Sequence, residues 1–154
     1  MIKEGIAVWA LRPGLASERE TLLLRRAVDP FRGQWFAVEG KLDPGEGVVT
    51  AALRELREET ALEPVKLFRQ RAQPWLVPSA GYVARVHVFV ALVARVEPVL
   101  NGEHSAYRWC APLQARRLLP DGAHQECFRE IERDFIREIA LDALAVSDPT
   151  EPNR

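Results

Sequence analysis

The chain has 154 residues, of which 47% are hydrophobic and 28% charged, and its formal net charge is −1. This length suffices for one domain that buries its own core without disulfide bonds. A nearly neutral chain lacks the positive charge typical of nucleic-acid or membrane-surface binding, and no uncharged apolar run is long enough to span a bilayer.

The start of the chain and its two cysteines favour a cytoplasmic protein. Met1 leads directly into strand-like sequence, without the pattern of a secretory signal. Cys110 and Cys127 are far apart in the sequence and form no CxxC pair, so we interpret them as buried, reduced thiols rather than as a disulfide.

Apolar patterning predicts strands over most of the first two thirds of the chain. Gly5 to Leu11 is nearly continuous in apolar character, as in a strand buried on both faces. Tyr82 to Val96 alternates strongly, which predicts a long central strand. Further strands are expected at 21–26, at 35–39, at 65–71 with a continuation toward Trp75, and at 105–109.

Helical patterns complete the fold. An acidic helix is expected between the strands at 35–39 and 65–71, and a short helix or turn segment at 112–119. A long amphipathic helix at about 123–145 should cover one side of the sheet. Its packing stripe consists of Phe128, Ile131, Phe135, Ile139 and Ala143. We therefore predict an α/β fold, an α/β/α sandwich with a mixed β-sheet, in one domain over residues 1–146 with a flexible tail over 147–154.

The stretch from Gly40 to Leu62 contains the acidic helix. Its residues Glu55, Glu58 and Glu59 are spaced i, i+3 and i+4, so their carboxylates gather on one face. Like charges at these spacings destabilise an isolated helix by about 0.2–0.5 kcal/mol per pair, and an i,i+4 pair between Arg54 and Glu58 relieves some of this repulsion. The alternative interpretation is an ordinary solvated face of arginine and glutamate.

A cluster of carboxylates on one helical turn suits a hard divalent cation. Mg²⁺ prefers oxygen ligands and keeps several waters, which leaves coordination sites for the oxygens of a diphosphate or triphosphate. Such an ion neutralises charge on phosphorus and lowers the pKa of a bound water. We expect Mg²⁺, with Mn²⁺ as the alternative, and disfavour zinc because no Cys/His set has ligand spacing.

The spacing of this stretch resembles that of the Nudix hydrolases. The family pattern is Gly, five residues, Glu, seven residues, then Arg-Glu-apolar-any-Glu-Glu-any-Gly-apolar. The matching residues are Gly40, Glu46, Arg54, Glu55, Leu56, Glu58, Glu59 and Leu62. Ala61 stands where the family has glycine; in a left-handed helix-end turn, alanine costs about 1 kcal/mol, or the turn takes another shape. The resemblance covers roughly residues 4–145.

The resemblance implies roles for the residues of the helix. Glu55, Glu58 and Glu59 are implied as metal ligands. Glu55 is also a candidate to orient or deprotonate the attacking water. Arg54 is similar to the family arginine that holds a glutamate in place.

Residues outside the helix complete the implied site. The backbone carbonyl of Glu39, directly before Gly40, is implied as another metal ligand, and Glu46 as a supporting acid near the helix start. Glu103 lies in a Glu-His-x-Ala-Tyr-x-Trp arrangement similar to that of dihydroneopterin-triphosphate and nucleoside-triphosphate pyrophosphohydrolases. It is the candidate for a ligand or base from outside the helix, and an ordinary loop charge is the equal alternative.

Three further residues are candidates for substrate binding. Arg26 ends a predicted strand, and the resemblance implies that an arginine here faces the phosphates; the alternative is that Arg25 and Arg26 only mark a strand leaving the core. Lys41 is expected to pair with a phosphate or with Glu39. Trp35 is expected to border the nucleobase or leaving group, or else to belong to the core.

The implied activity is Mg²⁺-dependent hydrolysis of the diphosphate linkage in a nucleoside diphosphate joined to a group X. A nucleoside or pterin triphosphate, cleaved to a monophosphate and pyrophosphate, is the first expectation. Gln73-Pro74-Trp75 resembles part of a motif of NADH pyrophosphatases, so an NADH- or ADP-ribose-type dinucleotide pyrophosphatase is one alternative. A non-catalytic, nucleotide-sensing domain is the other. The expected partner is a small nucleotide, with neither nucleic acid nor membrane, and a homodimer is left open.

Overall fold

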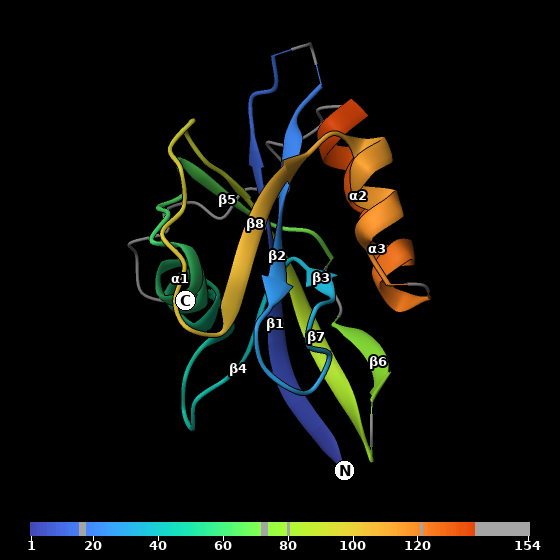
Figure 1. Cartoon of the computed structure of the whole chain (residues 1–154). Helices are drawn as coiled ribbons and strands as arrows, with labels where there is room; N and C mark the ends of the chain where they lie inside the picture. The colour runs from blue at the N-terminus through green and yellow to red at the C-terminus, as the bar shows by residue number, and fades with distance from the viewer. Residues whose placement is uncertain (16–17, 72–73, 80, 121, 138–154) are drawn as a thin grey trace.

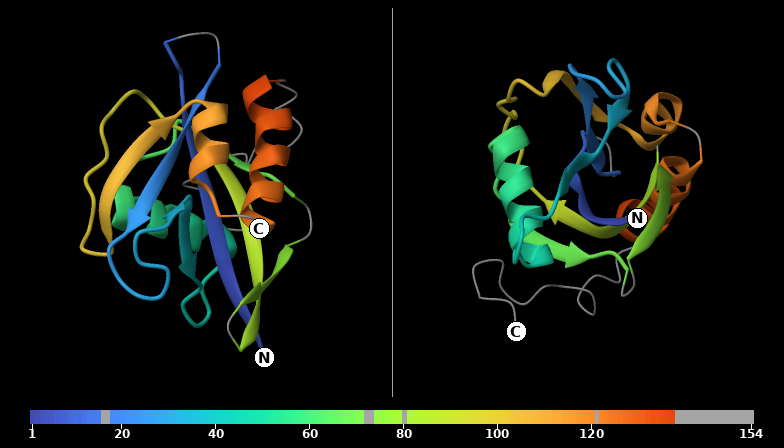
Figure 2. Two further views of the ribbon diagram at one scale, coloured as in Figure 1. Left: turned by 45° about the vertical axis from the view of Figure 1, so that its right-hand side comes forward. Right: turned by 90° about the horizontal axis from the view of Figure 1, so that it is seen from below.

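A mixed β-sheet of 8 strands separates two helical layers in the described part of the chain (Figures 1 and 2). One face is covered by α1 (Val48–Thr60), and the other by α2 (Pro112–Leu118) and α3 (Ala123–Ile131). The predicted α/β sandwich with a mixed sheet is confirmed. The structure is a computed structural model that describes residues 1–15, 18–71, 74–79, 81–120 and 122–137.

The strand β1 (Ile2–Arg12) lies at the centre of the sheet. It pairs in parallel with β7 (Tyr82–Leu92) along most of its length. It also pairs antiparallel with β2 (Glu20–Arg26) and with β4 (Val38–Lys41). The run from Ile6 to Leu11 is buried throughout, as its apolar continuity predicts.

The outer strands extend the sheet on both sides. Beside β2 lie β3 (Trp35–Phe36) and β8 (His104–Cys110), both antiparallel to it. On the other side, β5 (Lys66–Arg69) and β6 (Trp75–Ser79) pair with different halves of β7. Together, β4 and β8 bring two distant parts of the chain toward α1.

Apolar side chains form one core on each face of the sheet. Between the sheet and α1, Leu53 and Leu56 pack in one cluster with Val8 of β1. On the opposite face, Trp9 contacts Phe128 of α3 with ring centroids 5.6 Å apart. Val8 and Trp9 belong to different cores because successive side chains of a strand point to opposite faces.

Three predicted strands have different bounds in the structure. The expected strand at 35–39 is divided into β3 and β4, because the chain leaves β2 there and joins β1. The strand expected from 65 ends at Arg69, and Trp75 begins a separate strand. The strand β7 ends at Leu92 rather than at Val96, because its parallel partner β1 ends at Arg12. Gln73 of the predicted dinucleotide motif lies outside the described residues.

The C-terminal region confirms the expected covering helix in part. The α3 helix is followed by a π-helix over Glu132–Arg137, and the predicted stripe residues Phe128, Ile131 and Phe135 are fully buried. The expected continuation to 145 and the expected tail over 147–154 lie outside the described residues. Among those described, no helix is both long and apolar enough to cross a membrane.

The expectations about the cysteines and about Ala61 are met. Cys110 and Cys127 are both free and buried. Ala61, which follows the last residue of α1, has φ of 58° and ψ of 14°, so it lies in the left-handed region. Its backbone N–H donates to the carbonyl of Arg57 at 2.8 Å and closes the helix. The family turn is therefore kept, with an alanine in the conformation that favours glycine.

Ala61→Gly should stabilise the protein. The left-handed conformation costs alanine about 1–2 kcal/mol, and the greater freedom of glycine in the unfolded chain offsets part of this. We expect the free energy of unfolding to rise by about 1 kcal/mol in urea denaturation. Ala51→Gly, inside α1, is the matched control and should lower it by about that amount or more. A loss of stability in Ala61→Gly would contradict the assigned turn.

Candidate functional site

The turn before α1 is closed by its own backbone and by one carboxylate. The N–H of Glu46 donates to the carbonyl of Asp43 at 3.0 Å, and Oε1 of Glu46 accepts from the N–H of Asp43 at 3.0 Å. Between them, Gly45 has φ of 77°, which glycine adopts without steric cost. The turn therefore leads from β4 into α1 and places Glu46 beside the helix.

The guanidinium of Arg54 connects this turn to the acids of α1. Its Nε and Nη2 form two parallel hydrogen bonds with Glu46, at 2.8 and 2.9 Å. Its Nη1 donates to Glu55 at 2.8 Å and to Glu58 at 3.2 Å, which confirms the expected i,i+4 pair. A further bond reaches the carbonyl of Lys41 at 3.0 Å. The fork lowers the pKa of Glu46 to about 2 and holds β4, the turn and the helix together.

Glu55 lies directly over the backbone of Gly40. A Cβ atom added to Gly40 would be 2.2 Å from Cδ of Glu55, far inside contact distance. Glycine at this position therefore allows the Glu55 carboxylate to approach β4. Burial raises the pKa of Glu55, and the bond from Arg54 opposes that shift.

Glu59 is the deepest acid of the cluster. Only 3% of its surface is exposed, and its Oε2 has no hydrogen-bond partner in the described part of the structure. Burial raises its pKa to about 9, and the negative charges of Glu55 and Glu103 add to the shift. A backbone hydrogen bond from Glu39 opposes it. In the absence of a cation, this carboxyl keeps a proton at neutral pH.

The three acids of α1 differ in environment although they share a spacing. Glu59 packs toward the sheet and Glu55 is mostly buried, whereas the side chain of Glu58 is 55% exposed. The three acids therefore lie along one side of α1, as expected, but they are buried to different depths. A ligand that engages all three would lie at the border between the core and the solvent.

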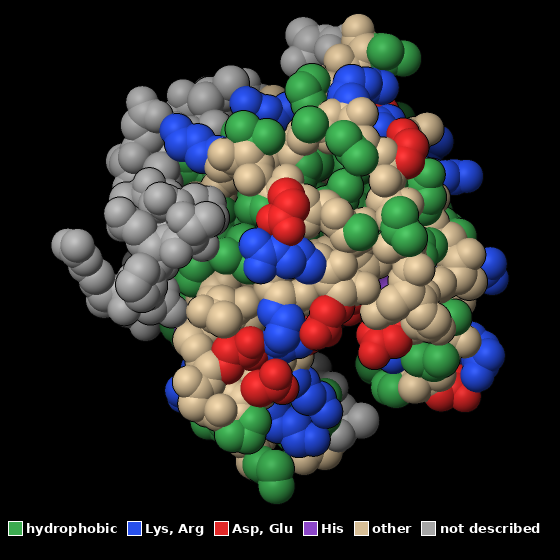
Figure 3. Space-filling view, turned by 90° about the vertical axis from the view of Figure 1, so that its left-hand side faces the viewer, with side chains coloured by type: hydrophobic (Ala, Val, Ile, Leu, Met, Phe, Trp, Pro, Cys, Tyr) green, Lys and Arg blue, Asp and Glu red, His purple; other side chains and the backbone are tan. Residues whose placement is uncertain are grey.

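Glu103 reaches the cluster from the loop before β8. Its backbone N–H donates to Oδ1 of Asn101 at 3.1 Å, and its carbonyl accepts from the N–H of Ala27 at 2.8 Å. One ligand atom each from Glu59, Glu103 and His104 lie within 4.8 Å of one another. In the view from the α1 side, acidic side chains border a hollow in the surface (Figure 3).

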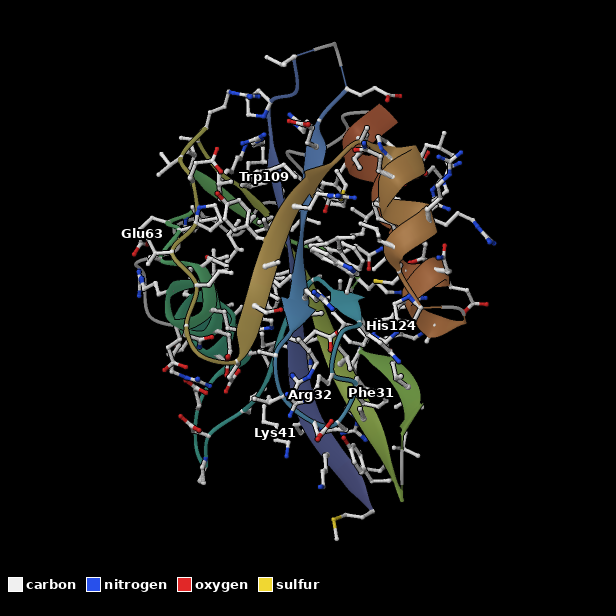
Figure 4. All side chains as sticks on the ribbon, viewed as in Figure 1. Phe31, Arg32, Lys41, Glu63, Trp109 and His124 are labelled. Carbon is white, nitrogen blue, oxygen red and sulfur yellow. The ribbon has the colours of Figure 1, made fainter. Side chains whose placement is uncertain are left out.

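Two basic residues lie near this end of the sheet. Arg26 is next to His104 in the pairing of β2 with β8, and its charge helps burial to lower the pKa of that histidine. Its Nε donates to the carbonyl of Pro30 at 2.8 Å. The exposed Lys41 ends β4, and Figure 4 places it with Arg32 toward the lower end of the molecule. Arg26 and Lys41, the two candidates for phosphate contacts, are thus at the same end of the sheet as the acids.

Two other candidate residues point away from the acids. The side chain of Glu39 lies toward α3, where its Oε1 is 3.1 Å from Nε2 of His124, while its backbone hydrogen-bonds to Glu59 and its charge adds to the raised pKa of Glu59. Trp35 packs against the core beneath α2 and α3, with the Arg108 guanidinium 6.0 Å from its ring centroid. Neither side chain belongs to the acidic cluster, because strand side chains alternate between faces.

Sequence reasoning missed two histidines, His104 beside the acidic cluster and His124 on α3. His104 follows Glu103 directly, so its position in the Glu-His motif was an available signal. His124 is 85 residues from Glu39, and its ring packs on Phe36 with centroids 4.9 Å apart. Nothing in the sequence around His124 indicates that contact, because it depends on how α3 packs on the sheet.

The metal-free protein should lose stability as the pH rises from about 7 to about 8.5. Folded Glu59 keeps its proton up to a pH of about 9, whereas in the unfolded chain its pKa is near 4.5. The folded state therefore binds more protons between these values, and the free energy of unfolding falls with rising pH.

Thermal unfolding in the presence of a chelator measures this effect. Glu59→Gln removes the titrating group, so its melting temperature should fall less over the same pH range. Glu63→Gln, at an exposed carboxylate paired with Arg57, is the control and should follow the native protein. Equal slopes for native and Glu59→Gln proteins would show that Glu59 is already ionised.

Comparison with known proteins agrees with this geometry. The family model described as NUDIX domain matches residues 4–133. A mouse asymmetrical bis(5'-nucleosyl)-tetraphosphatase is 35% identical over 120 residues, which are 70% of this chain and 76% of that protein. The mouse 8-oxo-dGDP phosphatase NUDT18 is 32% identical over 79 residues, 49% of this chain, and the match spans only 24% of that protein.

Solved structures share the fold. A Caenorhabditis elegans Ap4A hydrolase in a binary complex superposes with a TM-score of 0.73 at 23% identity, covering 85% of this chain and 96% of that one. The NUDIX domain of Shewanella oneidensis NrtR, complexed with ADP ribose, gives 0.75 at 17% identity over 86% and 88% of the two chains. Because the NUDIX family model matches residues 4–133 and the acids of the motif lie on α1, this chain belongs to the Nudix family.

Proposed function

We propose that this chain is a divalent-metal-dependent hydrolase that cleaves the diphosphate linkage of a nucleoside diphosphate joined to a group X. The observation that carries the proposal is the environment of Glu59. A carboxyl buried with an unpartnered oxygen requires either a proton or a cation. Glu103 lies close enough to share such a cation, and oxygen donors suit a hard divalent ion.

The ion is proposed to be Mg²⁺, with Mn²⁺ as the alternative. Its ligands are proposed to be Glu55, Glu58, Glu59, Glu103 and the backbone carbonyl of Glu39. When bound, such an ion neutralises charge on phosphate oxygens and lowers the pKa of a coordinated water. Arg54 orients Glu55 and Glu58 rather than contacting the substrate, because its hydrogen bonds are directed to these two acids, to Glu46 and to the backbone of Lys41.

The chemistry required of the side chains is a proton transfer and charge stabilisation. A water oxygen forms a bond to one phosphorus while the bond from that phosphorus to the bridging oxygen breaks, and the leaving group keeps the electron pair. Glu55 or Glu103 accepts the proton of the water. The raised pKa of Glu55 suits it to accept this proton. Arg26 and Lys41 are proposed to bind the phosphates.

The relatives together with the site support three substrate classes. A nucleoside or pterin triphosphate remains the first proposal, and the mouse tetraphosphatase adds the dinucleoside tetraphosphates. A dinucleotide-type substrate remains the alternative, since the similar NrtR domain is complexed with ADP ribose. Trp35 lies on the other face of the sheet, so we do not extend the phosphate site to it.

A substrate panel with Mg²⁺ distinguishes these classes by their products. Pyrophosphate release from dATP or dihydroneopterin triphosphate supports the triphosphate class. Release of a nucleoside triphosphate and a nucleoside monophosphate from a dinucleoside tetraphosphate supports the tetraphosphate class. Nucleoside monophosphate from NADH or ADP-ribose supports the dinucleotide alternative. Binding without turnover of any of them would contradict the hydrolase proposal and favour a sensing domain.

Glu59→Gln should lower kcat by about a hundredfold or more, because it removes a charged ligand from the centre. The fold should remain intact, since glutamine has nearly the shape of the protonated carboxyl that Glu59 carries in the metal-free protein. Glu63→Gln is the matched control and should keep native kcat; Figure 4 shows Glu63 at the far side of α1. Near-native turnover by Glu59→Gln would exclude Glu59 from the centre.

Gly40→Ala should also lower kcat, by about a hundredfold, because the new Cβ displaces the carboxylate of Glu55. Melting temperatures should change little, since the end of a flexible side chain moves rather than backbone. Gly102→Ala is the control, because its added Cβ would meet no atom within 4 Å. If both variants keep native kcat, the close approach of Glu55 to β4 has no role in turnover.

A further inference from the structure

His104 is the first residue of β8 and is buried at the edge of the acidic cluster. Only 8% of its surface is exposed, and its Nδ1 has no hydrogen-bond partner within the described residues. Leaving a buried ring nitrogen unpaired costs free energy. A ring nitrogen left unpaired in this position therefore calls for a partner that the described part of the chain does not supply.

The other two histidines of the chain are paired. Nε2 of His87 is 3.0 Å from Glu4, and its Nδ1 is 3.0 Å from Arg69. Nε2 of His124 is 3.1 Å from Glu39. This contrast distinguishes His104 from an ordinary buried histidine, which is hydrogen-bonded to its neighbours.

The distances around His104 suit a shared cation. One of its ring nitrogens lies within 4.8 Å of a carboxylate oxygen of Glu59 and of one of Glu103. Three ligands spread evenly around a divalent ion, each about 2.1 Å from it, are about 3.6 Å apart. The three side chains therefore need to approach one another by at most about 0.7 Å each to coordinate one ion.

We infer that His104 supplies a nitrogen ligand to the divalent ion held by Glu59 and Glu103, and that this ligand biases the centre toward a transition metal such as Mn²⁺ over Mg²⁺. The inference rests on the metal centre of the proposed function and adds to it a ligand and a selectivity. Imidazole binds first-row transition metals well, whereas Mg²⁺ strongly prefers oxygen. The carboxylates alone would discriminate less between these two ions.

The test is metal binding to the full-length, metal-free chain rather than turnover. Titration followed by electron paramagnetic resonance gives the Kd for Mn²⁺, and competition by Mg²⁺ gives the second Kd. In His104→Gln we expect the Kd for Mn²⁺ to rise about tenfold or more and that for Mg²⁺ by less than about threefold. His87→Gln is the matched control and should leave both values unchanged.

Pulsed paramagnetic resonance on the native protein gives a second readout that does not depend on how a variant folds. Bound Mn²⁺ should show the coupling of a coordinated imidazole nitrogen, and His104→Gln should lose it. A native spectrum without that coupling, or a variant with unchanged Mn²⁺ affinity, overturns the inference. If either result occurs and Glu59→Gln still abolishes Mn²⁺ binding, the metal centre of the proposed function stands without His104 as a ligand. If Glu59→Gln binds Mn²⁺ as tightly as the native protein, the proposed centre itself fails.

Discussion

The geometry of the acidic cluster depends on the guanidinium of Arg54. It forms a two-bond fork with Glu46 and holds one oxygen of Glu55, so it joins the turn before α1 to the helix. A planar fork of this kind fixes direction as well as distance, which the flexible ammonium of lysine does not. The carboxylates of α1 repel one another, and Arg54 lets them remain on adjacent turns near the end of the sheet.

The positive charge of Arg54 offsets the repulsion among the other acids, but Arg54 makes no hydrogen bond to Glu59 among the described residues. Arg54 contacts Glu46, Glu55 and Glu58, and the deepest acid is left with an unpartnered oxygen and a raised pKa. The same region receives Glu103 from the loop before β8, which increases the negative charge. A site with this excess of buried acid binds a proton or a metal ion, and the exchange of one for the other couples metal affinity to pH.

Much of this arrangement could be predicted from spacing along one segment. The helix, its apolar side and the approach of Arg54 to Glu58 all follow from the 3.6-residue period, which is local. The depth of Glu59 and the direction of the Glu39 side chain could not, because they depend on how α1 and β4 pack on β1. The contact of His124 with Glu39 was missed for the same reason, since it depends on how α3 packs on the sheet.

Anomalous diffraction from crystals of the protein soaked with Mn²⁺ would test the account most directly. It predicts an anomalous peak within coordination distance of carboxylate oxygens of Glu59 and Glu103, at the border of the hollow beside α1. No peak at that position in a well-occupied soak, with the Glu59 carboxyl still lacking a partner, would contradict the claim that these acids form a metal centre.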